Sequence, residues 1–115
     1  MSEKNDLMFI EHVLDSINAI RDFSKDMNKD EFIKNRLKKS AIVREIEIIG
    51  EAVKNISSDL KHKHSEIEWR EIVGTRDKMI HHYFGVDLNI VWSIVKNDIS
   101  KLKSKIEKIL LELSK

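Results

Sequence analysis

The segment Leu37–Ser57, LKKSAIVREIEIIGEAVKNIS, decides the fold that we predict for this chain. Its main apolar side chains recur every three or four residues, which is the spacing of one face of an α-helix: Ile42, Ile46, Ile49, Val53 and Ile56. Further apolar residues widen this stripe beyond one face, namely Val43, Ile48 and Ala52. Such a helix needs more than one neighbour, so we expect it at the centre of a bundle or at a dimer contact. Gly50 costs this helix up to about 1 kcal/mol relative to alanine, and close approach of a second backbone is one reason to keep it.

Three more amphipathic segments complete the predicted bundle. Residues 6–27 carry a stripe formed by Leu7, Ile10, Val13, Leu14, Ile17 and Ile20. Residues 69–84 form a third helix that ends at Gly85, with a break at Gly74 as an open alternative. Asp87 is expected to cap the fourth helix, residues 88–113, whose stripe is Leu88, Val91, Val95, Ile99, Leu102, Ile106, Ile109 and Leu113. Between these helices we expect two short helical turns: one capped by Asp30 and carrying Phe32 and Ile33, and one within residues 57–69.

The composition favours helices over sheets. The chain has 115 residues, three glycines and no proline, whereas the turns of a sheet lean on glycine, proline, asparagine and aspartate. We therefore expect one domain, residues 1–115, with an all-α fold: an up-and-down helical bundle of four main helices plus short helical turns.

The net charge and the absence of cysteine exclude several classes of binding site and active site. The net charge of +1 gives no overall basic field for nucleic acid, so binding to RNA or DNA would rest on a local patch. The absence of cysteine removes disulfides, thiolate metal sites and cysteine nucleophiles. The N-terminus predicts no signal peptide, and no apolar run reaches the length of a membrane span, so we expect a cytoplasmic protein.

The stretch Gly74–Asp87, GTRDKMIHHYFGVD, gathers groups that can move protons and hold anions. On a straight helix Asp77 and His81 share a face, so Asp77 could bond one imidazole nitrogen and leave the other for chemistry. Arg76 and Tyr83 would also share a face. Arg76 and His81, however, would lie about 140° apart around the axis. Either the helix bends before His81, or the Arg76 side chain wraps round it, or the two residues meet across a partner chain.

These residues also have structural interpretations. The pair His81 and His82 could interact with a helix dipole, and Arg76 could form a surface ion pair. Tyr83, Phe84, Trp69 and Trp92 could all be aromatic residues of the core. His62 and His64 would face different ways on a helix, which argues against a metal site. The basic run of residues 34–39 could be a solvated face or an edge that attracts phosphate.

Arg76, His81 and Tyr83 match the pattern Arg-x4-His-x-Tyr, and with this motif the chain resembles the HepT toxins of the HEPN superfamily. IIGEAVKNIS resembles the second-helix signature of that family, and IEW, IVGTRDKMIHHYFGVD and VWSIVKNDI resemble its third and fourth helices in order and spacing. The resemblance covers nearly the whole chain. One local departure is the absence of the proline that the family usually carries before the tryptophan, here Trp69.

This resemblance implies an all-helical homodimer that acts on RNA as a metal-independent endoribonuclease, without a cofactor. The motifs of two chains would meet in a cleft at the two-fold interface, with Arg76 and His81 as catalytic residues. The resemblance also implies a partner, a small MNT-type nucleotidyltransferase antitoxin. In several members such a partner transfers AMP from ATP to the motif tyrosine, which is Tyr83 here.

The chemistry of these residues fits RNA cleavage on independent grounds. Attack by the 2′-hydroxyl needs a base, an acid for the leaving 5′-oxygen, and positive charge on the phosphorane. Histidine can be acid or base, and Arg76 can hold phosphate oxygens. One His81 does not easily fill both roles, so a two-fold dimer would supply it twice. Asp77 would orient His81, and His82 is a reserve candidate.

Functions of other classes remain open. The chain could be a non-catalytic helical subunit that docks a nucleotidyltransferase or a nucleotide, or a purely structural helical dimer. Growth arrest on expressing this chain alone would favour the ribonuclease over both.

Overall fold

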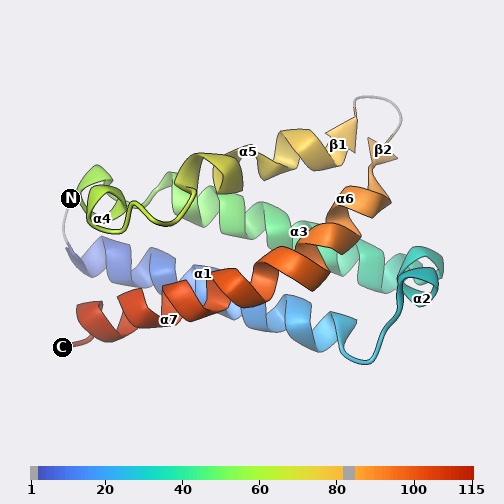
Figure 1. Ribbon diagram of the computed structural model, residues 1–115, viewed down its shortest axis with the longest axis horizontal. Helices are drawn as coiled ribbons and strands as arrows, with labels where there is room; N and C mark the ends of the chain where they lie inside the picture. The colour runs from blue at the N-terminus through green and yellow to red at the C-terminus, as the bar shows by residue number, and fades with distance from the viewer. Residues whose placement is uncertain (1–2, 82–84) are drawn as a thin grey trace.

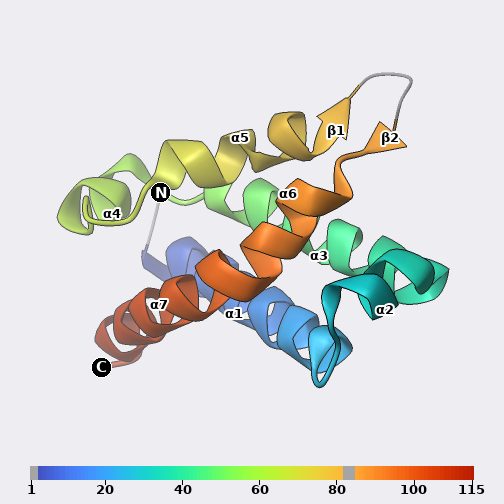
Figure 2. The same cartoon turned by 45° about the vertical axis from the view of Figure 1, so that its right-hand side comes forward.

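The computed structural model describes residues 3–81 and 85–115, with side chains for residues 5–80 and 85–115. The chain forms an elongated bundle of 43 × 30 × 21 Å (Figure 1). Its elements, in chain order, are α1 (Glu3–Ser24), α2 (Lys29–Lys34), α3 (Arg36–Lys54), α4 (Ser58–Lys63), α5 (Trp69–Met79), β1 (Ile80–His81), β2 (Gly85–Val86), α6 (Leu88–Ser93), the π-helix η2 (Ile94–Asp98) and α7 (Ile99–Leu113). The last three follow one another as a single rod (Figure 2). The predicted all-α bundle of four main helices with short helical turns is therefore confirmed.

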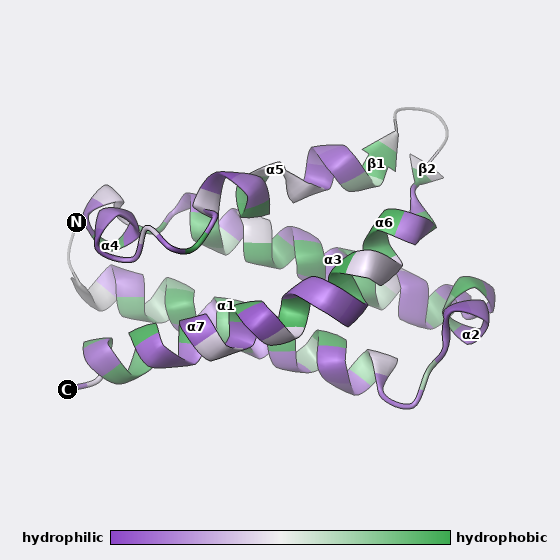
Figure 3. Cartoon of the chain, in the orientation of Figure 1, coloured by the Kyte–Doolittle hydropathy of each residue, from purple (hydrophilic) through white to green (hydrophobic). Residues whose placement is uncertain are grey.

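Helix α3 lies at the centre of the bundle, as its wide apolar stripe predicts. It packs against both α1 and α5, and α1 also packs against α7. The five residues of its main stripe are all buried, including Ile56 just beyond the helix end. Burying one isoleucine side chain contributes roughly 1.5–3 kcal/mol. Figure 3 shows hydrophobic and hydrophilic stretches alternating along α3 and its neighbours, as expected for helices that turn one face to a core.

The π turn η2 keeps the apolar stripe of the rod on one face. Val91, Val95 and Ile99 are all buried although they follow one another at two successive spacings of four. On a regular α-helix these two steps would drift by about 80° around the axis. The wider π turn takes up that drift. The remaining residues of the predicted stripes in α1 and in the rod are buried or half-buried, so both stripes are confirmed.

Polar side chains cap the helices, at positions that the sequence predicts only in part. Asp87 caps α6 as expected, because its side chain accepts hydrogen bonds from the backbone N–H groups two and three residues on, at 3.1 and 3.2 Å. The cap of α2 is Asn28, and the prediction of Asp30 is wrong. Asn28 and Glu31 exchange side chain–backbone hydrogen bonds of 2.9 and 3.0 Å. This capping box satisfies two backbone donors and places Asp30 inside the first turn.

The carboxylate of Asp6 ties the start of α1 to the junction between α3 and α4. Asp6 is only 5% exposed, and it accepts hydrogen bonds from the backbone N–H and the hydroxyl of Ser57 at 2.8 and 2.6 Å. The Ser57 hydroxyl also caps α4 by accepting a bond from the Leu60 backbone N–H at 3.2 Å. A buried carboxylate requires such partners, so this contact fixes where the two helices meet.

Helix α5 ends at Met79, and the prediction that it continues to Phe84 is wrong. It runs without a break past Gly74, but the backbone becomes extended at Ile80, with φ −106° and ψ 120°. Strands β1 and β2 then pair antiparallel, with Ile80 opposite Val86 and His81 opposite Gly85. Gly85 has φ +80°, a conformation that glycine adopts without strain. It therefore serves this hairpin and does not end a helix as predicted.

Two carboxylates interact at the start of α5, one from Glu68, the residue before the helix, and one from Glu71 in its first turn. A side-chain hydrogen bond with Glu71, and then the negative charge of Glu71, raise the pKa of the Glu68 carboxyl above its usual value of 4.5. Desolvation raises this pKa further, while Lys105 on α7 and Lys78 on α5 oppose the shift without cancelling it. The folded protein therefore holds a proton on Glu68 more tightly than the unfolded chain does.

Gly50→Ala should stabilise the protein although Gly50 lies where two helices meet. An added β-carbon would lie 3.6 Å from the carbonyl oxygen of Ile72 and 3.9 Å from that of Val73, which are ordinary contact distances. The expected close approach of a second backbone is thus confirmed, and it still leaves room for a methyl group. Because alanine is the better helix former, we expect the free energy of unfolding in urea to rise by up to about 1 kcal/mol.

Gly74→Ala is the matched control, because Gly74 lies inside α5 with nothing within 4 Å of an added β-carbon. It reports helix propensity alone. A destabilised Gly50→Ala protein beside a stabilised Gly74→Ala protein would show that the contact between α3 and α5 does require glycine.

Glu68→Gln should raise the thermal midpoint at pH 7 and have less effect as the pH falls toward 4.5. Because the folded-state pKa of Glu68 is raised, its stabilising contribution is complete below about pH 4.5 and is lost as the pH rises through the folded-state pKa. Glutamine can donate to Glu71 without the like-charge repulsion. Thermal melts of both proteins at the two pH values test this, and an equal difference at both would contradict the titration.

Candidate active site at the end of helix α5

The described part of the motif lies where α5 gives way to the hairpin, at one end of the bundle (Figures 1 and 2). Arg76 and Asp77 are exposed residues near the end of α5. His81 is the second residue of β1, and its backbone lies opposite Gly85. The side chain of His81 lies outside the described part of the chain, as do residues 82–84, which include His82, Tyr83 and Phe84. The roles expected of those side chains therefore stay predictions.

The end of α5 overturns an expectation that rests on a straight helix. Asp77 and His81 do not share a helical face, because the helix stops at Met79 and His81 lies in a strand. The expected common face of Arg76 and Tyr83 involves a residue outside the described part of the chain. The backbone departs from helical geometry before His81. Whether Arg76 meets His81 within one chain or across a partner chain stays a prediction, because the side chain of His81 lies outside the described part of the chain. The orienting role of Asp77 stays a prediction, without its original geometric reason.

Arg76 is paired with a residue that the sequence did not single out. Its Nε donates a hydrogen bond to Oε2 of Glu47 on α3 at 3.1 Å. The Arg76 side chain is 59% exposed, whereas the Glu47 side chain is 24% exposed. The predicted surface ion pair therefore exists, but it joins two helices. The sequence could have pointed to Glu47, because it lies between the apolar residues Ile46 and Ile48, at the edge of the stripe that α3 buries.

A basic hollow of about 450 Å³ lies beside the hairpin. Its lining comes from the first turns of α3 and from the segment after the motif: Arg36, Lys39, Ser40, Val43, Val86 and Leu88. Val86 directly follows Gly85, the partner of His81 across the ladder. Two residues of the basic run therefore stand next to the motif, where cationic side chains can meet the backbone of a nucleic acid.

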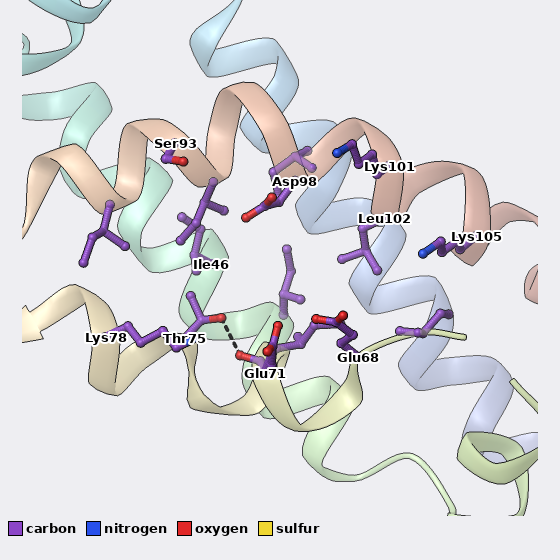
Figure 4. Close-up of a pocket in the computed structure, with 16 residues that line it drawn as sticks. Ile46, Glu68, Glu71, Thr75, Lys78, Ser93, Asp98, Lys101, Leu102 and Lys105 are labelled. Atoms are coloured by element: carbon purple, nitrogen blue, oxygen red, sulfur yellow. Dashed lines mark hydrogen bonds between the residues drawn. The ribbon is translucent and has the colours of Figure 1, made fainter. Parts of the chain in front are cut away.

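A larger groove of about 490 Å³ runs between α5 and the rod, with α3 as its floor. Figure 4 shows Glu68, just before α5, and Glu71, Thr75 and Lys78 on α5 across from Ser93, Asp98, Lys101, Leu102 and Lys105 on the rod. The floor is apolar and includes Ile46 and Ile49. Lysines and carboxylates balance along the rim, so this groove does not single out phosphate, and Arg76 does not line it.

The other candidates have structural roles. Trp69 is buried and donates from Nε1 to the carbonyl oxygens of Lys61 and His64, at 3.2 and 3.1 Å. Trp92 stacks on the buried Phe32 with ring centroids 5.2 Å apart. The imidazole of His64 contacts the carboxylate of Glu112 on α7 at 2.7 Å. These contacts agree with the core interpretation of the tryptophans and give His64 a task that needs no metal.

The described part of the chain contains neither a cluster of metal ligands nor a helix that could span a membrane. Within residues 5–80 and 85–115, whose side chains the structure describes, no three histidine, aspartate or glutamate side chains gather as a metal site would require. Over those same residues, no helix has the length and apolar character to cross a bilayer.

The chain is similar to known proteins over most of its length. A family model described as "Ribonuclease HepT-like" matches residues 13–109. The chain is 44% identical over 101 residues to "Probable ribonuclease HepT" of Thermococcus cleftensis, covering 88% of this chain and 92% of that protein. It is 40% identical over 107 residues to "Putative RNase MJ1380" of Methanocaldococcus jannaschii, covering 93% and 98% of the two chains.

A third similar protein is longer. "Gamma-glutamylcyclotransferase and putative RNase MJ0434" of Methanocaldococcus jannaschii is 44% identical over 108 residues, covering 94% of this chain but 49% of that protein, so the chain spans about half of its length. The comparison with solved structures found no match. Since the family model covers most of the sequence, and two relatives are matched over nearly their full length, the chain belongs to the ribonuclease HepT-like family of the HEPN superfamily.

Proposed function

We propose that this chain is a metal-independent endoribonuclease and the toxin of a cytoplasmic toxin–antitoxin pair. The observation that carries the proposal is an exposed guanidinium, Arg76, placed shortly before His81 at the helix–hairpin junction in a chain of this family. The names of the similar proteins as ribonucleases support the reaction class. The basic hollow beside the hairpin, with Arg36 and Lys39, supports a polyanionic substrate.

The reaction would be an internal transesterification of RNA. A base takes the proton of the 2′-hydroxyl, the 2′-oxygen forms a bond to the adjacent phosphorus, and the bond from phosphorus to the 5′-oxygen breaks. An acid returns a proton to that 5′-oxygen, which leaves a 2′,3′-cyclic phosphate and a 5′-hydroxyl. His81 is suited to both proton transfers, each contributing about 10²–10⁴-fold. Arg76 would hold the charge that builds on the phosphate oxygens.

A homodimer would complete this site. One imidazole does not easily act as base and acid in the same step, and a two-fold axis would bring two copies of His81 and two of Arg76 to one phosphate. Asp77, exposed near the end of α5, would orient the imidazole of its own or the partner chain.

The partner would be a nucleotidyltransferase antitoxin that controls Tyr83. The phenol oxygen of Tyr83 would attack the α-phosphorus of ATP and release pyrophosphate, which leaves AMP on the tyrosine. The added nucleotide places bulk and a negative charge two residues from His81. Both should exclude the RNA backbone.

His81→Ala and Arg76→Ala should each abolish RNA cleavage and relieve growth arrest. Cleavage of a fluorescent RNA oligonucleotide in EDTA is the measurement, with a fall of at least about 10²-fold expected for loss of the acid–base group. His82→Ala is the neighbouring control and should change the rate much less. Wild-type cleavage in EDTA together with equally fast cleavage by His81→Ala would refute the catalytic assignment.

A mixture of the two inactive chains should regain part of the activity. If Arg76 of one chain serves His81 of the other, heterodimers of Arg76→Ala and His81→Ala contain one intact composite site. Sedimentation at micromolar concentration should show a dimer, and a monomer would disprove the homodimer. Proven heterodimers without activity would disprove only the sharing of one site between chains.

Tyr83→Phe should fold, keep at least part of its toxicity and resist neutralisation by modification. The substitution keeps the ring but removes the acceptor oxygen. After incubation with the partner, ATP and Mg²⁺, mass spectrometry should find one or more AMP units on the wild-type peptide that contains Tyr83. An equal gain of mass on the Tyr83→Phe chain would place the acceptor elsewhere, and neutralisation without added mass would point to inhibition by complex formation.

A further inference from the structure

We propose that Glu47 is a positioning residue that holds Arg76 ready for an RNA phosphate. The carboxylate accepts a hydrogen bond from Nε of the guanidinium at 3.1 Å, and no hydrogen bond of the two terminal nitrogens is found among the described residues. The inference rests on the proposed function of the same site. It adds a residue from α3, outside the motif, to a site that the motif alone places on α5 and the hairpin.

The packing of the two helices brings Glu47 to Arg76. One turn further along α3, the backbone at Gly50 approaches the carbonyl groups of Ile72 and Val73 on α5. Moving back from Gly50 to Glu47 on α3 corresponds to moving forward from Val73 to Arg76 on α5, because the helices run antiparallel (Figure 1). The Glu47 side chain is the less exposed partner, at 24% against 59%. Glu47 is therefore the anchor, and Arg76 is the group presented to solvent.

The chemistry of a guanidinium makes this contact useful. Arginine has five N–H donors in a planar fork, and only the Nε donor is spent on Glu47. The four donors on the terminal nitrogens can bind two phosphate oxygens together. A free arginine side chain samples many rotamers, and an anchor at Nε removes part of that freedom before the substrate arrives.

The rival interpretation predicts effects of opposite sign. An exposed ion pair contributes little to stability, and a carboxylate near a phosphate site repels the polyanion through space. If Glu47 acted only by its charge, removing it would tighten RNA binding. If it positions Arg76, removing it weakens RNA binding and slows cleavage, although a negative charge has been taken away.

Two substitutions of Glu47 and one control separate these interpretations. Glu47→Ala removes the acceptor, whereas Glu47→Gln removes the charge but keeps an oxygen that can accept from Nε. Glu51→Ala removes the same charge from an exposed position one turn along α3. The measurements are single-turnover cleavage of an RNA oligonucleotide in EDTA and the affinity, at fixed salt, for the same sequence with 2′-deoxyribose at the cleavage position. Thermal melts confirm that each variant is folded.

We expect Glu47→Ala to slow cleavage by roughly tenfold to a hundredfold, as for a displaced catalytic group, and to weaken binding of the uncleavable oligonucleotide. Glu47→Gln should recover much of both losses, and Glu51→Ala should leave both unchanged. In an Arg76→Ala background, Glu47→Ala should have no further effect, because its action passes through the guanidinium. Unchanged or tighter binding by Glu47→Ala, or effects that add to those of Arg76→Ala, would overturn the proposal.

The binding arm distinguishes this inference from the proposed nuclease activity. If the wild-type protein binds the oligonucleotide without cleaving RNA, the ribonuclease proposal fails, and Glu47 still counts as a positioning residue when its removal weakens binding only in the presence of Arg76. If the wild-type protein neither binds nor cleaves, both proposals fail.

Discussion

The close antiparallel packing of α3 against α5 is the constraint on which the rest of the structure depends. Residues from α3 form much of the core, and the same helix meets the α5 backbone at Gly50 and the Arg76 side chain at Glu47. A helix with one buried face would need one neighbour, whereas α3 has α1 on one side and α5 on the other. Burial of its apolar residues therefore stabilises the bundle. It also fixes the position of α5 along α3, and so places Arg76 next to Glu47.

Long-range periodicity made most of this fold predictable. The stripes in α1, α3 and the rod are spaced for helices, and burial follows them closely, down to residues such as Ile56 beyond a helix end. The caps and the ends of individual helices were harder to predict. Asp30 and Asn28 are both good caps by residue type, and only the reciprocal bond with Glu31 selects Asn28. Likewise, nothing in the helical pattern of residues 69–84 marks Met79 as the end, because the reason is the pairing of Ile80 with Val86, residues on either side of the hairpin.

In the candidate site, too, the residues of the motif could be predicted from the sequence, whereas their arrangement in space and their partners on other helices could not. The motif marks Arg76 and His81 by residue type and order, yet their relation in space depends on a change from helix to strand between them. Glu47 could not be found from the motif, since it lies 29 residues away from Arg76 and pairs with it only when two helices pack. Arg76, near the end of α5, thus contacts a neighbouring helix through Glu47, and the backbone that follows it turns into a strand before His81.

The π turn in the rod gives the chain an unusual tolerance to a change of length. Residues Ile94–Asp98 hold one residue more than a regular helix would need between the buried Val91 and Ile99. Deleting one residue there would leave the two ends seven apart, close to two full α-helical turns. The rod could then close as a regular α-helix with α7 still facing the core, whereas the same deletion within α3 would rotate half of its stripe away from α1 and α5. The loss of one residue from the rod should therefore be accommodated most easily at this turn.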